Sequence, residues 1–162
     1  RQVLNRLYTM QVCQTRSSSD PDLTMDDYIG EIASKNEQLL VGLETTEEQL
    51  EIIRKDVEGM PKKVHRKRIA KQIELMRDHT WSQTCKVTTA YREMRMDYYS
   101  NEPCMNNVLL TDRNNKWMNT LTSSLNEYSC FIVVGLSHLQ FECGLLNQLR
   151  DGGFIITPID PY

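Results

Sequence analysis

The sequence predicts an α/β protein that is rich in helices and has a partial, mostly parallel sheet. Residues 129–159 read as a strand, a short helix and a second strand: SCFIVVGLS, ECGLLNQLRDGG and FIITPI. A strand–helix–strand unit of about thirty residues is the right-handed crossover of a parallel sheet. LLVGL at residues 39–43 has the apolar character of a third buried strand. Most of the remaining chain shows helical periodicity.

Composition and length predict one globular domain over residues 1–162. Charged residues make up 25 % of the chain and hydrophobic residues 40 %, which is ordinary for a folded domain. The net charge of −3 gives no signature of nucleic-acid binding, and no apolar run is long enough to span a bilayer. Three strands are few for so many helices, and the chain opens in helix-like RQVLNRLYTM. We therefore expect the amino-terminal part of the fold to be missing from this chain.

The first half of the chain carries clear helix starts. Residues 2–14 have an amphipathic pattern, and SSSDPD at 17–22 predicts a mobile loop because Ser, Asp and Pro disfavour helix. Thr24 stands three residues before Asp27, and Thr45 three residues before Glu48. This spacing is typical of the side-chain caps that begin helices.

From residue 61 onward the chain continues with further helices and with residues that begin or end them. Pro61 suits the first turn of a basic helix, whose six Lys and Arg residues alternate with an apolar face and lack interleaved aromatics. This favours a solvated surface over a nucleic-acid site. Residues 82–98 and 105–125 also have helical spacing, and the pair Gly152 and Gly153 predicts the end of the last helix.

The cysteines give no metal or disulfide signature. They are five in number, and no two form a Cys-x-x-Cys pair. They are thus a poor framework for zinc or disulfides, and we expect small buried apolar residues rather than redox-active groups. The five are Cys13, Cys85, Cys104, Cys130 and Cys143.

Two predicted strands are followed by residues whose side chains could bind a metal or take part in a reaction. FIVVG is followed by His138, and LLVGL is followed by Glu44. Ligands of open parallel sheets bind beyond the carboxyl ends of the strands, where imidazole and carboxylate can share a metal ion. The alternative is an ordinary loop histidine with its hydrogen bonds satisfied.

Arg113 and Asn114 form a second candidate pair, within LLTDRNNKW. A guanidinium aimed at the ligand edge can bind a carboxylate or stabilise an oxyanion. The alternative for Arg113 is a surface salt bridge with Asp112 or Glu127, which contributes little.

Three segments in order resemble the TraB/GumN (PrgY, TIKI) family. The first is MDDYIGEIASKNEQLLVGLETTEEQL (25–50), similar to an Asp-x-Tyr-Leu helix followed by a strand and Gly-Leu-Glu-Thr. The second is LLTDRNNKWMNTL (109–121), similar to an Arg-Asn-x-x-Trp helix. The third is FIVVGLSHLQFECGLLNQLRDGGFIITPI (131–159), similar to a closing Gly-x-x-His segment. The sequence is thus identified as the carboxyl-terminal portion of a domain of this family.

The resemblance implies a fold of the ChaN/EreA-like type and a metal-dependent hydrolase of peptidase type. It implies His138 as metal ligand or catalytic imidazole, Glu44 as a second metal ligand, and Arg113 as the group that binds a substrate carboxylate or oxyanion. Asn114 would orient its neighbours. The metal would be a divalent ion such as Zn, Mn or Co, the substrate a peptide or protein, and the location the cell envelope or outside the cell.

The sequence also departs from the family pattern. The family's first Gly-x-x-His and its acidic pair are not in these residues, so a missing amino-terminal half or a second chain is expected to complete the site. Its Trp-x-x-Gly-Asp element stands here as Trp81-Ser82-Gln83-Thr84. These departures leave a second interpretation open: a non-enzymatic module with the same scaffold that binds or inhibits a peptide or protein.

Overall fold

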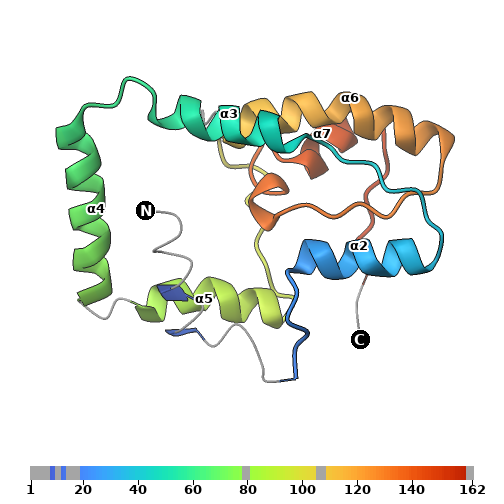
Figure 1. The fold of residues 1–162 in the computed structure, drawn as a ribbon. Helices are drawn as coiled ribbons and strands as arrows, with labels where there is room; N and C mark the ends of the chain where they lie inside the picture. The colour runs from blue at the N-terminus through green and yellow to red at the C-terminus, as the bar shows by residue number, and fades with distance from the viewer. Residues whose placement is uncertain (1–7, 10–11, 14–18, 78–80, 105–108, 160–162) are drawn as a thin grey trace. The chain divides into compact units, whose positions relative to one another are not determined.

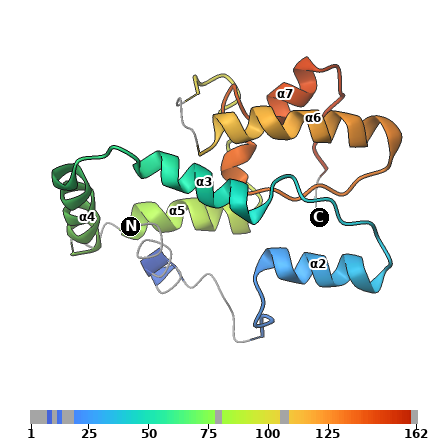
Figure 2. The same ribbon diagram turned by 45° about the horizontal axis from the view of Figure 1, so that its top comes forward.

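The chain divides into two compact units in a computed structural model that describes residues 8–9, 12–13, 19–77, 81–104 and 109–159. The first unit is Arg1–Gly42 with Gly59–Met96, and the second is Leu43–Glu58 with Asp97–Tyr162. Figures 1 and 2 show the helices of both. The prediction of one domain over residues 1–162 stays a prediction.

The first unit contains α2 (Met25–Lys35), α4 (Lys62–Arg77) and α5 (Trp81–Arg92). The second contains α3 (Thr46–Val57), α6 (Thr111–Glu127), the 3₁₀ turn η1 (Leu136–His138) and α7 (Leu145–Asp151). The helix expected over residues 2–14 lies almost wholly outside the described residues. Of the loop expected at 17–22, the described residues 19–22 form turns and bends.

Both predicted helix caps are confirmed. The Thr24 hydroxyl accepts a hydrogen bond from the Asp27 backbone N–H at the start of α2, at 3.2 Å. At α3, the Thr45 hydroxyl accepts from the Glu48 N–H at 3.2 Å, and the Glu48 carboxylate accepts from the Thr45 N–H at 3.0 Å. These bonds satisfy backbone donors that the first turn of a helix leaves without partners.

The predicted α/β fold class is wrong. The described residues form helices and connecting segments, and none of them lies in a strand or a sheet. The segments 39–43, 129–137 and 154–159 were expected to be strands, but none of them has a hydrogen-bonded ladder. Residues 136 and 137 begin the turn η1 instead, and the rest of these segments runs between or after helices. Leu39, Phe131 and Ile155 are 87 %, 87 % and 93 % exposed, so the apolar runs are not buried strands.

The error has a physical cause. A short apolar run indicates a preference for burial, but a strand forms only where a neighbouring backbone supplies hydrogen bonds. Within the described part of the chain, no partner segment pairs with these runs. The crossover unit inferred from these runs and the ChaN/EreA-like sheet implied by the family resemblance are therefore absent from the described residues as well.

The core of the second unit forms where α6 meets α7. Trp117 and Leu121 of α6 lie on one helical face and pack against Leu145 of α7, and all three are at most 4 % exposed. Leu43, Met118, Val134 and Leu139 surround them and are partly buried. After α6 the chain turns back and runs beneath the helix towards η1 (Figure 1). This path brings residues far apart in sequence to the first turns of α6.

The cysteine prediction is also wrong, because four of the five residues are bonded. Cys13 pairs with Cys85 in the first unit, and Cys104 pairs with Cys143 in the second. Cys130 is free and exposed. The sequence did not indicate either pair, because partners 72 and 39 residues apart leave no local motif.

None of the helices within the described ranges has the length and apolar character needed to cross a membrane.

Candidate functional site

The site is built on the first turns of α6. Arg113, Asn114 and Trp117 lie within one and a half turns of the helix, and Asn114 and Trp117 are buried, at 1 % and 4 % exposed. Positions three and four residues apart share a helical face. A polar side chain as deeply buried as Asn114 needs hydrogen-bond partners.

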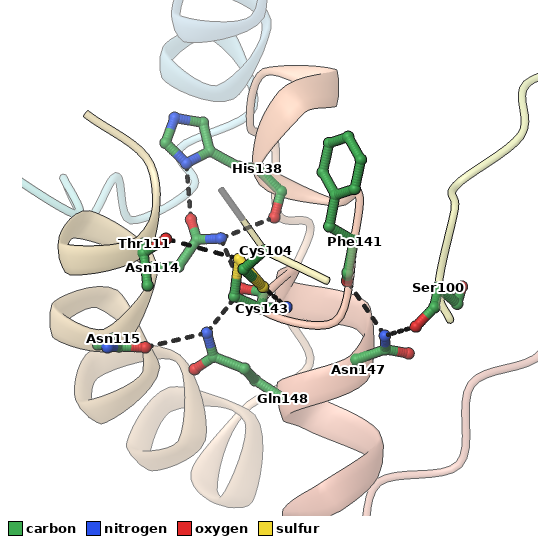
Figure 3. The surroundings of a disulfide bond; sticks show 10 residues. All are labelled: Ser100, Cys104, Thr111, Asn114, Asn115, His138, Phe141, Cys143, Asn147 and Gln148. Atoms are coloured by element: carbon green, nitrogen blue, oxygen red, sulfur yellow. Dashed lines mark hydrogen bonds between the residues drawn. A yellow bond between two sulfur atoms is a disulfide. The ribbon is translucent and has the colours of Figure 1, made fainter. Parts of the chain in front are cut away.

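Asn114 and His138 form a buried hydrogen-bonded pair. The Asn114 amide nitrogen Nδ2 donates to the backbone carbonyls of His138, at 3.1 Å, and of Cys143, at 2.9 Å. Carbonyls only accept, so these two bonds fix which end of the carboxamide is which. The amide oxygen Oδ1 then faces Nδ1 of His138 at 2.6 Å, as Figure 3 shows.

This arrangement also fixes the tautomer of His138. Oδ1 of an amide can only accept a hydrogen bond, so Nδ1 of the imidazole must carry the proton. In the neutral ring, Nε2 then holds the lone pair. His138 is 5 % exposed and ends the turn η1, which follows Gly135. The site thus presents an oriented imidazole with one nitrogen available as a ligand or acceptor.

Trp117 contacts both the neutral imidazole of His138 and the charged guanidinium of Arg113. Its ring centroid is 4.4 Å from that of His138, and the guanidinium carbon of Arg113 lies 4.7 Å from the Trp117 ring centroid. A guanidinium over an indole face is attracted by the negative face of the ring. Trp117 therefore holds both Arg113 and the imidazole in place.

Arg113 and Glu44 form a two-point ion pair. Nε of Arg113 donates to Oε2 of Glu44 at 2.9 Å, and an NH2 group donates to Oε1 at 2.5 Å. The third guanidinium nitrogen donates to the Leu109 carbonyl at 3.1 Å, and Gln49 donates to Glu44 at 3.0 Å. The side chains are 16 % and 11 % exposed. Neither Asp112 nor Glu127, the salt-bridge partners considered from sequence, is the partner of Arg113.

The electrostatics keep His138 neutral and Glu44 charged. Burial lowers the pKa of His138 to about 4, with a further lowering by the charge of Arg113 and a smaller opposing effect of Glu44. Burial alone would raise the pKa of Glu44, but the hydrogen bond and charge of Arg113 hold it below its ordinary value. At neutral pH the imidazole therefore keeps its lone pair.

The described residues fit a divalent metal only in part. His138 offers Nε2, and its Nδ1–H is held by a hydrogen-bond acceptor, as is usual for metal-binding histidines. Both oxygens of Glu44 already accept hydrogen bonds from Arg113. Across the described ranges, no group of three or more His, Cys, Asp or Glu side chains could hold a metal ion. A metal centre typically takes three protein ligands, so further ligands would have to join His138.

Comparison with known proteins identifies the family. The model of the TraB/PrgY/gumN family matches residues 2–158, so the chain belongs to that family. This confirms the resemblance seen in the three sequence segments. No curated relative and no solved structure matches the chain.

The structure brings all four predicted site residues together. Glu44 reaches Arg113 from the segment before α3, and Asn114 reaches His138 from α6. Their chemical roles stay predictions. Sequence reasoning gave no role to Trp117, although it stands four residues after Arg113 and hence on the same helical face. Cys143 was missed as well. Its backbone carbonyl accepts a hydrogen bond from Asn114, and no pattern of side chains in the sequence indicates such a contact.

Proposed function

We propose that this chain carries part of the site of a metal-dependent hydrolase of peptidase type. The observation that supports it most is the imidazole of His138, buried, neutral and fixed with Nε2 unprotonated. A base is most effective when its pKa lies near the working pH, so a pKa of about 4 favours a ligand role over a general-base role. Membership of the TraB/PrgY/gumN family supports the same reading.

The other residues take roles that their contacts support. Arg113 uses three of its five N–H donors on Glu44 and Leu109, which leaves two for a substrate carboxylate or oxyanion. Glu44 holds the guanidinium in place. Oε1 of Glu44 accepts from both Arg113 and Gln49, whereas Oε2 accepts one hydrogen bond and keeps a lone pair that a metal ion could use. Asn114 orients the imidazole.

A divalent ion such as Zn, Mn or Co would supply a bound water of lowered pKa. The residues described here would bind, orient and hold charge around that chemistry. Residues beyond this site, in the same protein or in a second chain, would complete the ligand set. The proposed substrate is a peptide or protein, and the proposed location is the cell envelope or the outside of the cell.

The test compares His138→Ala with His65→Ala, a histidine of α4 in the other unit. Mn²⁺ binding is measured by calorimetry, and cleavage is measured by mass spectrometry on a mixture of unstructured peptides. We expect metal affinity and cleavage to fall at least tenfold in His138→Ala, in keeping with loss of a ligand, and to stay unchanged in His65→Ala. Equal binding and equal cleavage in both variants would refute the proposal.

A second candidate is a module that binds a peptide or protein without cleaving it. It is favoured by the exposed apolar side chains of the segments that follow α6 and α7, where Phe131, Ile155 and Ile159 are each at least 87 % exposed. Exposed apolar side chains that gather in one patch mark interaction surfaces, and this candidate requires that these three do so. Binding of an unstructured peptide with unchanged peptide mass, with or without Mn²⁺, would support this candidate over the hydrolase.

A further inference from the structure

The disulfide between Cys104 and Cys143 joins two segments beside the candidate site. Around it, Phe141 donates its N–H to the Tyr98 carbonyl at 2.9 Å, and the Phe141 ring stacks on Tyr99 with centroids 5.8 Å apart. Further hydrogen bonds cross between the segments: the Glu142 N–H donates to the Glu102 carbonyl, and the Gln140 side-chain amide donates to the Asp97 carbonyl, each at 3.1 Å. Asn147 of α7 donates to the carbonyls of Ser100 and Phe141, at 2.8 and 3.1 Å. The disulfide is thus the covalent member of a larger set of contacts.

The backbone of Cys143 connects this disulfide to the imidazole. The Cys143 carbonyl accepts from Asn114 Nδ2 at 2.9 Å and from Gln148 Nε2 at 2.8 Å. Asn114 in turn faces Nδ1 of His138. Figure 3 shows these bonds as one chain, from the two sulfur atoms through the Cys143 carbonyl and the carboxamide to the imidazole ring.

The carboxamide of Asn114 depends on this carbonyl for its orientation. The His138 carbonyl alone would hold Nδ2 by one bond, and that carbonyl moves with the same turn as the imidazole. The Cys143 carbonyl gives a second anchor on a different segment. A displaced Cys143 would free the carboxamide to rotate, and Nδ1 of His138 would lose its fixed acceptor.

We propose that Cys143 is a positioning residue for the Asn114–His138 pair, and that the Cys104–Cys143 disulfide makes this positioning sensitive to redox state. A dithiol reductant would break the S–S bond with two electrons and two protons, giving two thiols and an oxidised, disulfide-bonded reductant. Cys143 would then be held by hydrogen bonds alone. The imidazole would sample both tautomers, and Nε2 would no longer be fixed as the free nitrogen.

The second disulfide provides a matched control. Cys13–Cys85 lies in the other unit, so Cys85→Ser removes one disulfide without removing the one beside His138. Cys104→Ser removes the bond under test but keeps the Cys143 carbonyl. Treatment of the wild-type chain with a phosphine reductant breaks both disulfides without any substitution, and together with Cys104→Ser it gives two forms that lack the bond under test.

The first readout is the ¹⁵N spectrum of the His138 ring in metal-free protein at neutral pH. We expect one tautomer, protonated at Nδ1, in wild type and Cys85→Ser, and a mixture of tautomers in Cys104→Ser and in the reduced wild type. The second readout is Mn²⁺ affinity, which we expect to fall roughly tenfold with loss of the oriented acceptor. Mn²⁺ is chosen because it binds thiolates weakly.

The Mn²⁺ readout rests on the proposed function, whereas the tautomer readout does not. The two readouts therefore distinguish failure of this inference from failure of the proposed function. A wild-type chain that binds no Mn²⁺ would count against the metal site, whereas the tautomer result would still test the positioning role. An unchanged single tautomer in Cys104→Ser would overturn the inference. So would peptide mapping that finds no Cys104–Cys143 bond in oxidised protein. Global unfolding of both reduced forms, measured by circular dichroism, would also refute the inference. The disulfide would then stabilise the whole fold and would not specifically position Asn114 and His138.

Discussion

Replacing Asn114 by leucine tests the buried pair most directly. The substitution removes three hydrogen bonds. The Cys143 carbonyl keeps its bond from Gln148, so two groups lose their partner: the His138 carbonyl and the His138 Nδ1–H. A buried polar group left unpaired costs about 1–3 kcal/mol. We therefore expect Asn114→Leu to lower the free energy of unfolding by about 2–6 kcal/mol.

The assay is urea unfolding followed by tryptophan fluorescence in a Trp81→Phe background. The chain has two tryptophans, so Trp117, which contacts His138, becomes the reporter for the second unit. Asn115→Leu is the matched control on the same helix. Asn115 is exposed and accepts one exposed hydrogen bond, from Gln148, so we expect a change within about 0.5 kcal/mol. Equal effects of the two substitutions would refute the reasoning.

Three further predictions concern the same unit. In Gly144→Ala the new methyl group would collide with two backbone carbonyls of the preceding turn, and we expect a loss of about 1–3 kcal/mol in urea unfolding. The pKa of His138, about 4 in the folded chain against 6.5 for the free side chain, means that its contribution is complete above pH 6.5. It is lost as pH falls from 6.5 through 4, by roughly 3 kcal/mol, and this part of the pH profile should be missing in His138→Gln. Glu44→Gln leaves the part-buried charge of Arg113 without its partner and should cost about 2–3 kcal/mol, whereas Lys116→Met, at an exposed pair, should cost under about 1 kcal/mol. A flat profile in wild type, or equal losses in the two ion-pair variants, would contradict the respective argument.

Much of the helical structure was predictable because its signals are local. Thr24 and Thr45 cap the helices that the spacing to Asp27 and Glu48 predicts. The glycine after α7 has the positive φ, +90° at Gly153, that a helix end favours. These features depend on residues within one or two turns, so a single sequence specifies them.

The sheet could not be decided in the same way. The runs at 39–43, 129–137 and 154–159 have strand-like composition, but strand formation depends on a neighbouring segment that composition does not identify. The disulfides were missed for the same reason, since Cys104 and Cys143 are 39 residues apart and meet only when their segments fold together.

The sequence by itself determined the helix starts, the family, and the residue types at the candidate site. Only the tertiary structure decided which of them meet. It pairs Arg113 with Glu44 across 69 residues, and Asn114 with His138 across 24. It also fixes the proton on Nδ1 of the imidazole, because that assignment depends on two backbone carbonyls that accept from Asn114. Carbonyls are identical in every residue, so their positions follow from the fold and cannot be read from side-chain identity.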